Sequence, residues 1–324
     1  MRNLLVTCLL LCSWWILCPA GEQRYGVVNL SVCNMREAPD YDAGMVSQAL
    51  LGTPVHVLEE SKWVNIMTPD AYTGWVHPDA VTILTREGYS EWNAAEKVVV
   101  TSLLGIVRDG PSPRAGTVSD VVGGARLKFL GTRGRYFRVG FPDGREGYLP
   151  KRDGDRESHW RMTLRSSGDD IAATALTMLG FPYLWAGMSP KGADCSGFVR
   201  TVFWMHDIII PRDAGPQSRE GEMIDIPSVG KGKDWSNLRP GDLVFFGRVV
   251  SGTVTDRVNH VGIYIGDGKY IHSLGKVKIA AMDPADPLFD PVTTGRMVFG
   301  RRILSRVGKD PNLTTSLSNG FYRE

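Results

Sequence analysis

The chain has 324 residues, of which 43% are hydrophobic and 22% charged, and its formal net charge at pH 7 is +2. No block of basic residues argues for a nucleic-acid partner, and the six histidines and five cysteines form no zinc-type cluster. We therefore expect a soluble protein with no bound metal, no other cofactor and no nucleic-acid partner.

The first segment, 1–20, differs in character from the rest. Arg2 is followed by an almost continuous apolar run that ends in small residues near Ala20. This pattern predicts an export signal, hence a periplasmic or envelope protein, and no other segment reaches the roughly 18 apolar residues of a membrane span. Cys18 is the candidate for a lipid anchor, but Leu17 before it is large where a small residue is usual.

Three of the five cysteines fall in this signal, so the mature chain retains only Cys33 and Cys195. Two cysteines do not make a disulfide framework. Cys33 is expected to be a buried thiol, because pairing it with Cys195 would consume the residue that the later motifs single out.

After the signal the chain repeats itself at an offset of about 72 residues. Gly52 corresponds to Gly124, and Gly74-Trp75 corresponds to Gly147-Tyr148. Each copy is a string of short strands separated by turn residues, which predicts a small β-barrel.

These predictions divide the N-terminal half into a first barrel at 21–85 and a second barrel at 98–153. The segments 86–97 and 151–168 are polar and predict connectors without a core of their own.

Cys195 begins an apolar segment with helical spacing that contains Phe198, Val199, Val202 and Phe203. At a helix N-terminus the unpaired backbone N–H groups and the helix dipole stabilise an anion, which predicts a lowered pKa for this thiol. The alternative is a small buried apolar residue.

Two histidines then flank a Gly-Asp-Gly turn at 266–268, between two alternating strands. A three-residue loop would pair Gly262 with His272 and place His260 and His272 on one face, whereas a two-residue loop would separate them. On one face they would supply a base and the group that orients it. The alternative is two polar residues on a half-exposed hairpin, which the upstream cysteine disfavours.

Three motifs occur in order: Asp-Cys-Ser-Gly-Phe-Val at 194–199, Arg-Pro-Gly-Asp-Leu-Val-Phe-Phe at 239–246, and His-Val-Gly-Ile-Tyr-Ile-Gly at 260–266. Together they resemble the NlpC-type cell-wall cysteine peptidases, which cleave the peptide stems of bacterial peptidoglycan. The resemblance covers roughly 165–305 and implies an α+β, papain-like catalytic domain at 165–310. The two preceding copies each resemble a bacterial Src-homology-3-like domain.

The two-barrel arrangement is similar to one subset of this family, the γ-D-glutamyl-L-diamino acid endopeptidases, also called dipeptidyl-peptidase VI. In that subset the barrels shape the cleft, and the enzymes accept stems with a free N-terminal L-alanine and release L-Ala-γ-D-Glu. The resemblance implies peptidoglycan stem peptides as substrates and a monomeric enzyme. It does not choose between lysine and diaminopimelate as the diamino acid.

The resemblance assigns roles to single residues. Cys195 becomes the nucleophile, His260 the base and later proton donor, and His272 the orienting group. The Tyr183 hydroxyl and the Cys195 N–H would stabilise the oxyanion.

The resemblance also implies substrate-binding positions, which are Tyr72, Trp185, Asp194, Ser196 and Asp213. Asp213 is expected near the substrate amine, and Tyr72 is expected to close the alanine end. For Tyr72 and Trp185 the alternative is ordinary packing.

Two positions depart from the pattern of the subset. Gly44 stands where a glutamate that binds the amine is expected, and Asp42 or Glu37 would have to substitute for it. Ala214 stands where serine is common, which removes one hydrogen bond to the glutamate carboxylate.

Three other functions compete with a peptidase for free stems. The same residues would serve a hydrolase that remodels intact wall, a different amidase or acyltransferase, or an inactive protein whose barrels bind wall or protein ligands. An occluded cleft disfavours the hydrolase of intact wall. An acidic residue near the substrate amine disfavours a different amidase or acyltransferase, and an intact Cys-His-His set disfavours an inactive binding protein.

Overall fold

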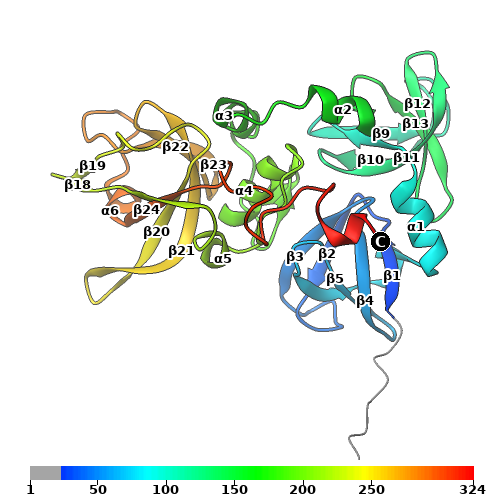
Figure 1. Cartoon of the computed structure of the whole chain (residues 1–324), viewed down its shortest axis with the longest axis horizontal. Helices are drawn as coiled ribbons and strands as arrows, with labels where there is room; N and C mark the ends of the chain where they lie inside the picture. Colours follow the sequence, from blue (N-terminus) through cyan, green and yellow to red (C-terminus); the bar gives the residue numbers. More distant parts are fainter. Residues whose placement is uncertain (1–22) are drawn as a thin grey trace, which may run out of the picture.

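The computed structural model describes residues 23–324, so the predicted export signal at 1–20 lies outside the described residues. Two antiparallel sheets come first and a region of mixed helices and strands follows (Figure 1). Among the described residues no helix is long and apolar enough to cross a membrane.

The first sheet has seven strands in the order β3-β2-β6-β5-β4-β1-β7. Its strands are β1 (Arg24–Val28), β2 (Val32–Arg36), β3 (Met45–Leu50), β4 (Pro54–Glu60), β5 (Val64–Met67), β6 (Thr73–Val76) and β7 (Val81–Leu84), with a 3-10 helix at Pro78–Ala80. The second sheet has the order β10-β9-β13-β12-β11-β8-β14. Its strands are β8 (Lys97–Val100), β9 (Leu104–Arg108), β10 (Thr117–Val122), β11 (Arg126–Arg133), β12 (Tyr136–Gly140), β13 (Glu146–Pro150) and β14 (Gly154–Arg156).

The two sheets have the same strand order, as the internal repeat predicts. β3 and β10 begin and end 72 residues apart, and the second residue after each of them is a glycine with a positive φ, 83° at Gly52 and 85° at Gly124. In residues 23–324 the strand pairing runs from β3 to β7 and from β10 to β14 and does not join these edge strands, so it shows two seven-stranded sheets and does not show the closed barrels that the sequence predicts.

The predicted connectors contain helices, α1 (Arg86–Ala94) and α2 (Glu157–Thr163). Thr85 caps α1 by accepting a hydrogen bond from the Gly88 N–H. Tyr89 and Trp92 on α1 are buried against the first sheet, so aromatic packing turns a polar-looking segment into a helix.

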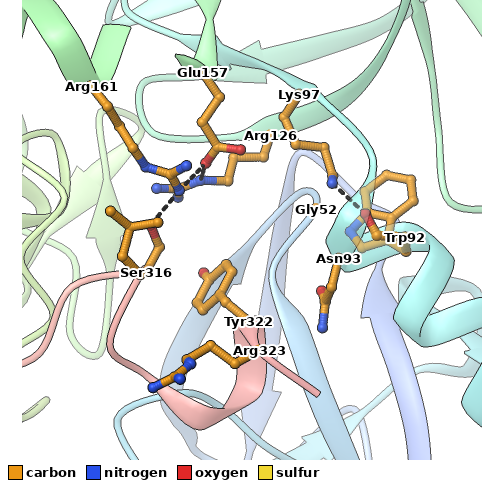
Figure 2. A pocket seen from close by; sticks show the side chains of 11 residues that line it. Gly52, Trp92, Asn93, Lys97, Arg126, Glu157, Arg161, Ser316, Tyr322 and Arg323 are labelled. Carbon is orange, nitrogen blue, oxygen red and sulfur yellow. Dashed lines mark hydrogen bonds and ion pairs between the residues drawn. The ribbon is translucent and has the colours of Figure 1, made fainter.

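Arg126 ties the second sheet to its neighbours (Figure 2). Its backbone N–H donates to the Leu51 carbonyl at 2.9 Å, and its guanidinium pairs with Glu157 at 3.0 Å and with Asp207 at 2.8 Å. A Cβ on Gly52 would lie 1.9 Å from the Arg126 carbonyl oxygen, so glycine is required for this contact between the sheets.

The remaining region is built on a six-stranded sheet in the order β17-β24-β20-β21-β22-β23. Its strands are β17 (Glu222–Asp225), β20 (Leu243–Val250), β21 (Thr253–Gly266), β22 (Lys269–Leu274), β23 (Lys276–Ala281) and β24 (Met297–Arg302). Two short hairpins, β15 (Met188–Ser189) with β16 (Gly192–Ala193) and β18 (Ser228–Val229) with β19 (Gly232–Lys233), lie outside this sheet. The helices are α3 (Gly168–Leu176), α4 (Cys195–Trp204), α5 (Ala214–Gln217), α6 (Pro291–Gly295) and a final 3-10 helix at Gly320–Tyr322.

Helix α4 packs on one face of this sheet. Phe198 and Phe203 of α4 are buried against Val261 and Ile271 in one core, and Phe246 faces a second core on the opposite side. Full burial of a side chain of this size stabilises a fold by about 1.5–3 kcal/mol, so this packing fixes the start of α4 relative to β21 and β22.

The chain after β24 returns to the first sheet, where the red segment ends in Figure 1. The His56 ring stacks on Phe321 with centroids 4.0 Å apart and pairs with Glu324 at 3.1 Å. The Asn319 side chain donates to the Pro69 carbonyl at 2.9 Å. The C-terminal segment therefore links the first sheet to the six-stranded region.

Candidate active site

Cys195 is the first residue of α4, as its sequence context predicts. Asp194 caps the helix, because its Oδ1 accepts the Gly197 N–H at 2.7 Å. The sulfur faces β21, where the Val261 N–H, together with that of Ser196, favours the thiolate. The thiol therefore lies beside the strand that carries His260.

The two histidines share a face by a route that differs from the predicted three-residue loop. Gly266 pairs with Lys269 across a two-residue turn in which Asp267 and Gly268 both have positive φ, 51° and 68°. A bulge between Tyr264 and Gly266 shifts the register by one residue, and Gly262 then lies opposite His272. The bulge restores the arrangement that a two-residue turn alone would have prevented.

His260 Nε2 lies 2.8 Å from His272 Nδ1, and both rings are buried. This contact occupies Nε2 of His260 and leaves its Nδ1 for the thiol side. Burial, the neighbouring His272 and the cations Arg296 and Lys278 lower the pKa of His260 to about 3, and burial with Lys278 lowers that of His272 to about 4. Both imidazoles are therefore neutral at pH 7, as a general base must be.

The lowered thiol pKa that the helix start predicts is wrong for this structure. Burial raises the pKa of Cys195 to about 11, and the carboxylate of Asp194 acts in the same direction. Loss of hydration and a neighbouring negative charge thus outweigh the backbone N–H groups that favour the anion. The resting pair is a neutral thiol beside a neutral imidazole.

A cavity of about 650 Å³ opens over the sulfur. The six-stranded region supplies most of its lining, and β3 with the chain before it and the loop before β6 supply the rest. All the predicted site residues line it except the fully buried His272. Trp185 is 71% exposed at its edge, so this ring is available to a ligand and is not core packing.

Tyr183 also lines the cavity close to the sulfur. Burial, together with the charges of Cys195 and Asp194, raises the pKa of its phenol to about 12. The hydroxyl therefore keeps its proton at neutral pH and can donate a hydrogen bond to a developing oxyanion.

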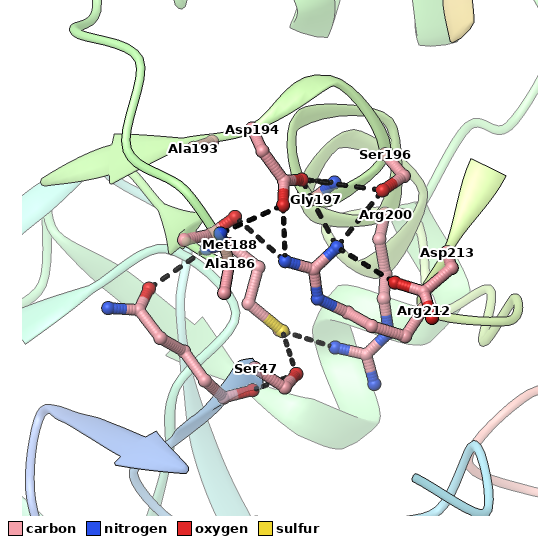
Figure 3. A network of polar contacts seen from close by, with 12 residues as sticks. Ser47, Ala186, Met188, Ala193, Asp194, Ser196, Gly197, Arg200, Arg212 and Asp213 are labelled. Atoms are coloured by element: carbon pink, nitrogen blue, oxygen red, sulfur yellow. Dashed lines mark hydrogen bonds and ion pairs between the residues drawn. The ribbon is translucent and has the colours of Figure 1, made fainter. Parts of the chain in front are cut away.

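Asp194 is held by Arg212, a residue that the sequence did not single out (Figure 3). Arg212 Nη2 lies 2.8 Å from Asp194 Oδ2, and Nη1 donates to Asp194 Oδ1 at 3.1 Å and to Ser196 Oγ at 3.0 Å. Asp194 Oδ2 also accepts the Ala186 N–H at 3.0 Å. Both carboxylate oxygens are thus bound by the protein, which makes Asp194 a positioning residue for the helix start and the loop that carries Trp185.

One end of the cavity is acidic and is closed by the first sheet region. Tyr72 faces Asp213. Burial and the charge of Asp213 raise the pKa of the Tyr72 phenol to about 12, and burial also raises the pKa of the Asp213 carboxyl group. Glu37 lines the same cavity and accepts the Gly44 N–H at 3.2 Å. A Cβ on residue 44 would lie 3.1 Å from Glu37 Oε1, so the Glu37 carboxylate occupies the space beside Gly44.

An ion pair anchors this wall to α4. Arg200 Nη2 lies 2.8 Å from Asp70 Oδ1, with the two side chains only 5% and 2% exposed. Asp70 lies within the turn that begins at Thr68, in which Ala71 adopts a positive φ of 60° and from which Tyr72 enters the cavity. No sequence motif marks this pair, because its partners are far apart in the chain.

Comparison with known families agrees with this geometry. The family description "NlpC/P60 family" matches residues 180–297, which contain the cysteine and both histidines. Residues 180–297 form an NlpC/P60 domain. The description "Bacterial dipeptidyl-peptidase Sh3 domain" matches residues 35–81 in the first sheet, which we call the Sh3 domain from here on.

Similar proteins support the same domains. A gamma-D-glutamyl-L-lysine dipeptidyl-peptidase of Bacillus cereus is 34% identical over 236 residues, which are 70% of this chain and 66% of that protein. Dipeptidyl-peptidase 6 of Lysinibacillus sphaericus is 26% identical over 81% of this chain and 93% of that protein. The chain thus spans just under two thirds of the Bacillus cereus relative.

A solved structure shares the arrangement. The crystal structure of an NlpC/P60 family protein from Bacillus cereus ATCC 10987 has a TM-score of 0.71 and 28% identity, and the match covers 86% of this chain and 99% of that one. The chain therefore carries a cysteine peptidase domain with the NlpC/P60 fold, next to a bacterial Sh3 domain. Within residues 23–324 no three His, Cys, Asp or Glu side chains are placed to hold a metal ion.

Proposed function

We propose that this protein hydrolyses the γ-D-glutamyl–diamino acid bond of peptidoglycan stem peptides whose N-terminal L-alanine is free, and releases L-Ala-γ-D-Glu. One observation carries the proposal. The end of the cavity that the Sh3 domain closes holds two carboxylates: Asp213 faces Tyr72, and Glu37 lines the same wall as Tyr72.

A free N-terminal amine is the group that fits this end. It is protonated below a pKa of about 8 and forms charge-assisted hydrogen bonds with carboxylates. A stem that is still attached to glycan has an amide there, with no charge and with added bulk. Glu37 takes the role that the resemblance gives to residue 44, and Ala214 leaves the glutamate carboxylate one hydrogen bond fewer.

The residues around the sulfur support acyl transfer. Cys195 Sγ attacks the γ-carbonyl of D-glutamate while His260 Nδ1 takes the thiol proton, and the oxyanion accepts hydrogen bonds from the Tyr183 hydroxyl and the Cys195 N–H. His260 then protonates the leaving amine, and a thioester remains on the sulfur. His260 next takes a proton from the water that attacks the thioester. The C–S bond then breaks, the dipeptide leaves with a new carboxyl group, and His260 returns the proton to Cys195 Sγ. His272 keeps the His260 ring in place through the 2.8 Å contact.

The relatives are named for this chemistry. Proteins of Bacillus cereus and Bacillus subtilis are called gamma-D-glutamyl-L-lysine dipeptidyl-peptidase. We extend that reaction class to this chain, together with three further predictions: residues 1–20 direct export, the protein acts in the cell envelope, and it is a monomer.

The test compares three substrates with the purified protein: the tripeptide L-Ala-γ-D-Glu-diamino acid, the same peptide N-acetylated, and intact sacculi. We expect cleavage of the free tripeptide with at least about tenfold loss on acetylation, since a hydrogen bond to a charged group contributes about 1.5–3 kcal/mol. Equal rates on free and acetylated peptide would support a wall-remodelling enzyme instead.

A matched pair of variants tests whether Glu37 causes the preference for the free peptide over the acetylated peptide. Glu37→Gln should reduce the preference for the free peptide by about tenfold, because it removes a charge at the amine. Glu59→Gln removes an exposed charge from the same Sh3 domain outside the cavity and should leave the preference unchanged. If both variants behave like the wild type, Glu37 does not bind the amine.

A further inference from the structure

The cavity also has a basic side, which the reaction described above does not use. Arg296, directly after α6, lines the cavity together with Asn259, the residue before His260. Its Nε donates to the Gly247 carbonyl at 2.9 Å and its Nη2 donates to Asn259 Oδ1 at 2.6 Å. Among the described side chains no carboxylate forms an ion pair with Arg296, so the protein groups that hold it are neutral.

The charged neighbours of the two ends of the cavity differ. Near Tyr72 they are the carboxylates of Asp213 and Asp70 and the guanidinium of Arg212, whereas near His260 they are the cations Arg296 and Lys278. Among the described residues, Asp290 is an acid that acts on His272, and its carboxylate is bound by the N–H groups of Val292 and Thr293 and by the Thr293 hydroxyl.

Arg296 and Lys278 thus present positive charge to the product that leaves the cavity at the His260 end. In the proposed reaction this is the diamino acid, because His260 protonates its amine.

We propose that Arg296 binds a carboxylate of the leaving diamino acid; this inference rests on the proposed function. Two neutral acceptors hold the guanidinium in one orientation, and among the described side chains nothing else accepts from the Nη1 group or from the second N–H of Nη2, which can therefore bind a ligand. A planar guanidinium pairs with a carboxylate through two parallel hydrogen bonds, which a neutral group does not reproduce.

Two carboxylates of the leaving residue have this chemistry. Every free tripeptide has the α-carboxylate of its last residue, and diaminopimelate adds a second carboxylate at its far end where lysine has only an ammonium. A lysine side chain would bring a positive charge toward Arg296, whereas the added carboxylate of diaminopimelate would neutralise it.

The experiment measures kcat/KM on four peptides. L-Ala-γ-D-Glu is followed by lysine or by diaminopimelate, each with a free or an amidated α-carboxyl group. Wild type is compared with Arg296→Gln, Arg296→Lys and the control Arg306→Gln. Arg296→Lys keeps the charge but loses the planar guanidinium that forms two parallel hydrogen bonds. Arg306 pairs with Asp310 in an exposed turn after β24 and does not line the cavity.

We expect Arg296→Gln to lower kcat/KM by about tenfold or more only on peptides that have the recognised carboxylate, with a smaller loss in Arg296→Lys. A reduced preference for diaminopimelate over lysine identifies the far carboxylate, and a reduced preference for free over amidated peptides identifies the α-carboxylate. Arg306→Gln should match the wild type.

Two results overturn the inference. Equal losses on all four peptides would show a structural role for Arg296, and unchanged rates on all four would show no role in binding. In either case wild-type cleavage of the peptides still supports the proposed function. If the wild type cleaves none of them, the proposed function is wrong and the inference fails with it.

Discussion

The buried ion pair between Asp70 and Arg200 offers the sharpest test of how the Sh3 domain forms the cleft. We consider Arg200→Met, which keeps much of the side-chain volume and removes the charge. Asp70 Oδ1 would lose its partner at 2.8 Å and retain only the hydroxyl of Thr68 at 2.6 Å. A nearly unexposed carboxylate would then have no cation beside it.

The structure sets the expected magnitude. Removing one partner of a buried ion pair costs about 3–5 kcal/mol, because the remaining charge stays out of water. Among the described residues Asp70 Oδ2 and Arg200 Nε have no hydrogen-bond partner, so the pair itself is incompletely satisfied. Replacing both residues, as Asp70→Asn with Arg200→Met, should therefore cost less than Arg200→Met alone.

The assay is the free energy of unfolding from urea titration, measured for both single variants, the double variant and the control Arg306→Met. The same proteins are tested on free and acetylated tripeptide, because a loosened turn at Asp70 displaces Tyr72 from the cavity and should weaken the preference for the free amine. If Arg200→Met loses less than about 1 kcal/mol, the size of a surface pair, the pair does not anchor the wall. A double variant less stable than Arg200→Met would contradict the argument from unsatisfied charge.

Three further predictions concern the chemistry. Cys195→Ala should abolish hydrolysis with unchanged melting, whereas Cys33→Ala, in the core of the first sheet, should leave turnover nearly unchanged; loss of turnover in both variants at unchanged melting would refute the assignment. The value of kcat should rise as pH increases through about 3, where His260 becomes neutral, and kcat/KM should fall above about 8 as the substrate amine loses its proton; His260→Ala with near-native turnover at every pH would exclude it as the base. Tyr183→Phe should lower kcat by about 10²–10³ if its hydroxyl donates to the oxyanion, and an unchanged kcat would assign the oxyanion to backbone groups alone.

Local patterns were sufficient for several features of this protein. Helical spacing after Cys195 predicts α4 with the thiol at its start, and alternation around 266–268 predicts the hairpin of the two histidines. The repeat of about 72 residues predicts two sheets of one design, and their strand orders agree. Each of these signals involves residues that are close in sequence or copied at a constant offset, so the backbone geometry of one element is enough to read them.

The properties that set reactivity and specificity depend on contacts between distant segments. The raised pKa of Cys195 comes from burial, which no helix-start motif reveals, and the shared face of the histidines depends on a bulge that corrects the turn. The Arg200–Asp70 pair joins residues 130 positions apart. Desolvation and charge pairing depend on three-dimensional distance rather than on spacing along the chain, and they become visible only once the Sh3 domain is packed against the NlpC/P60 domain.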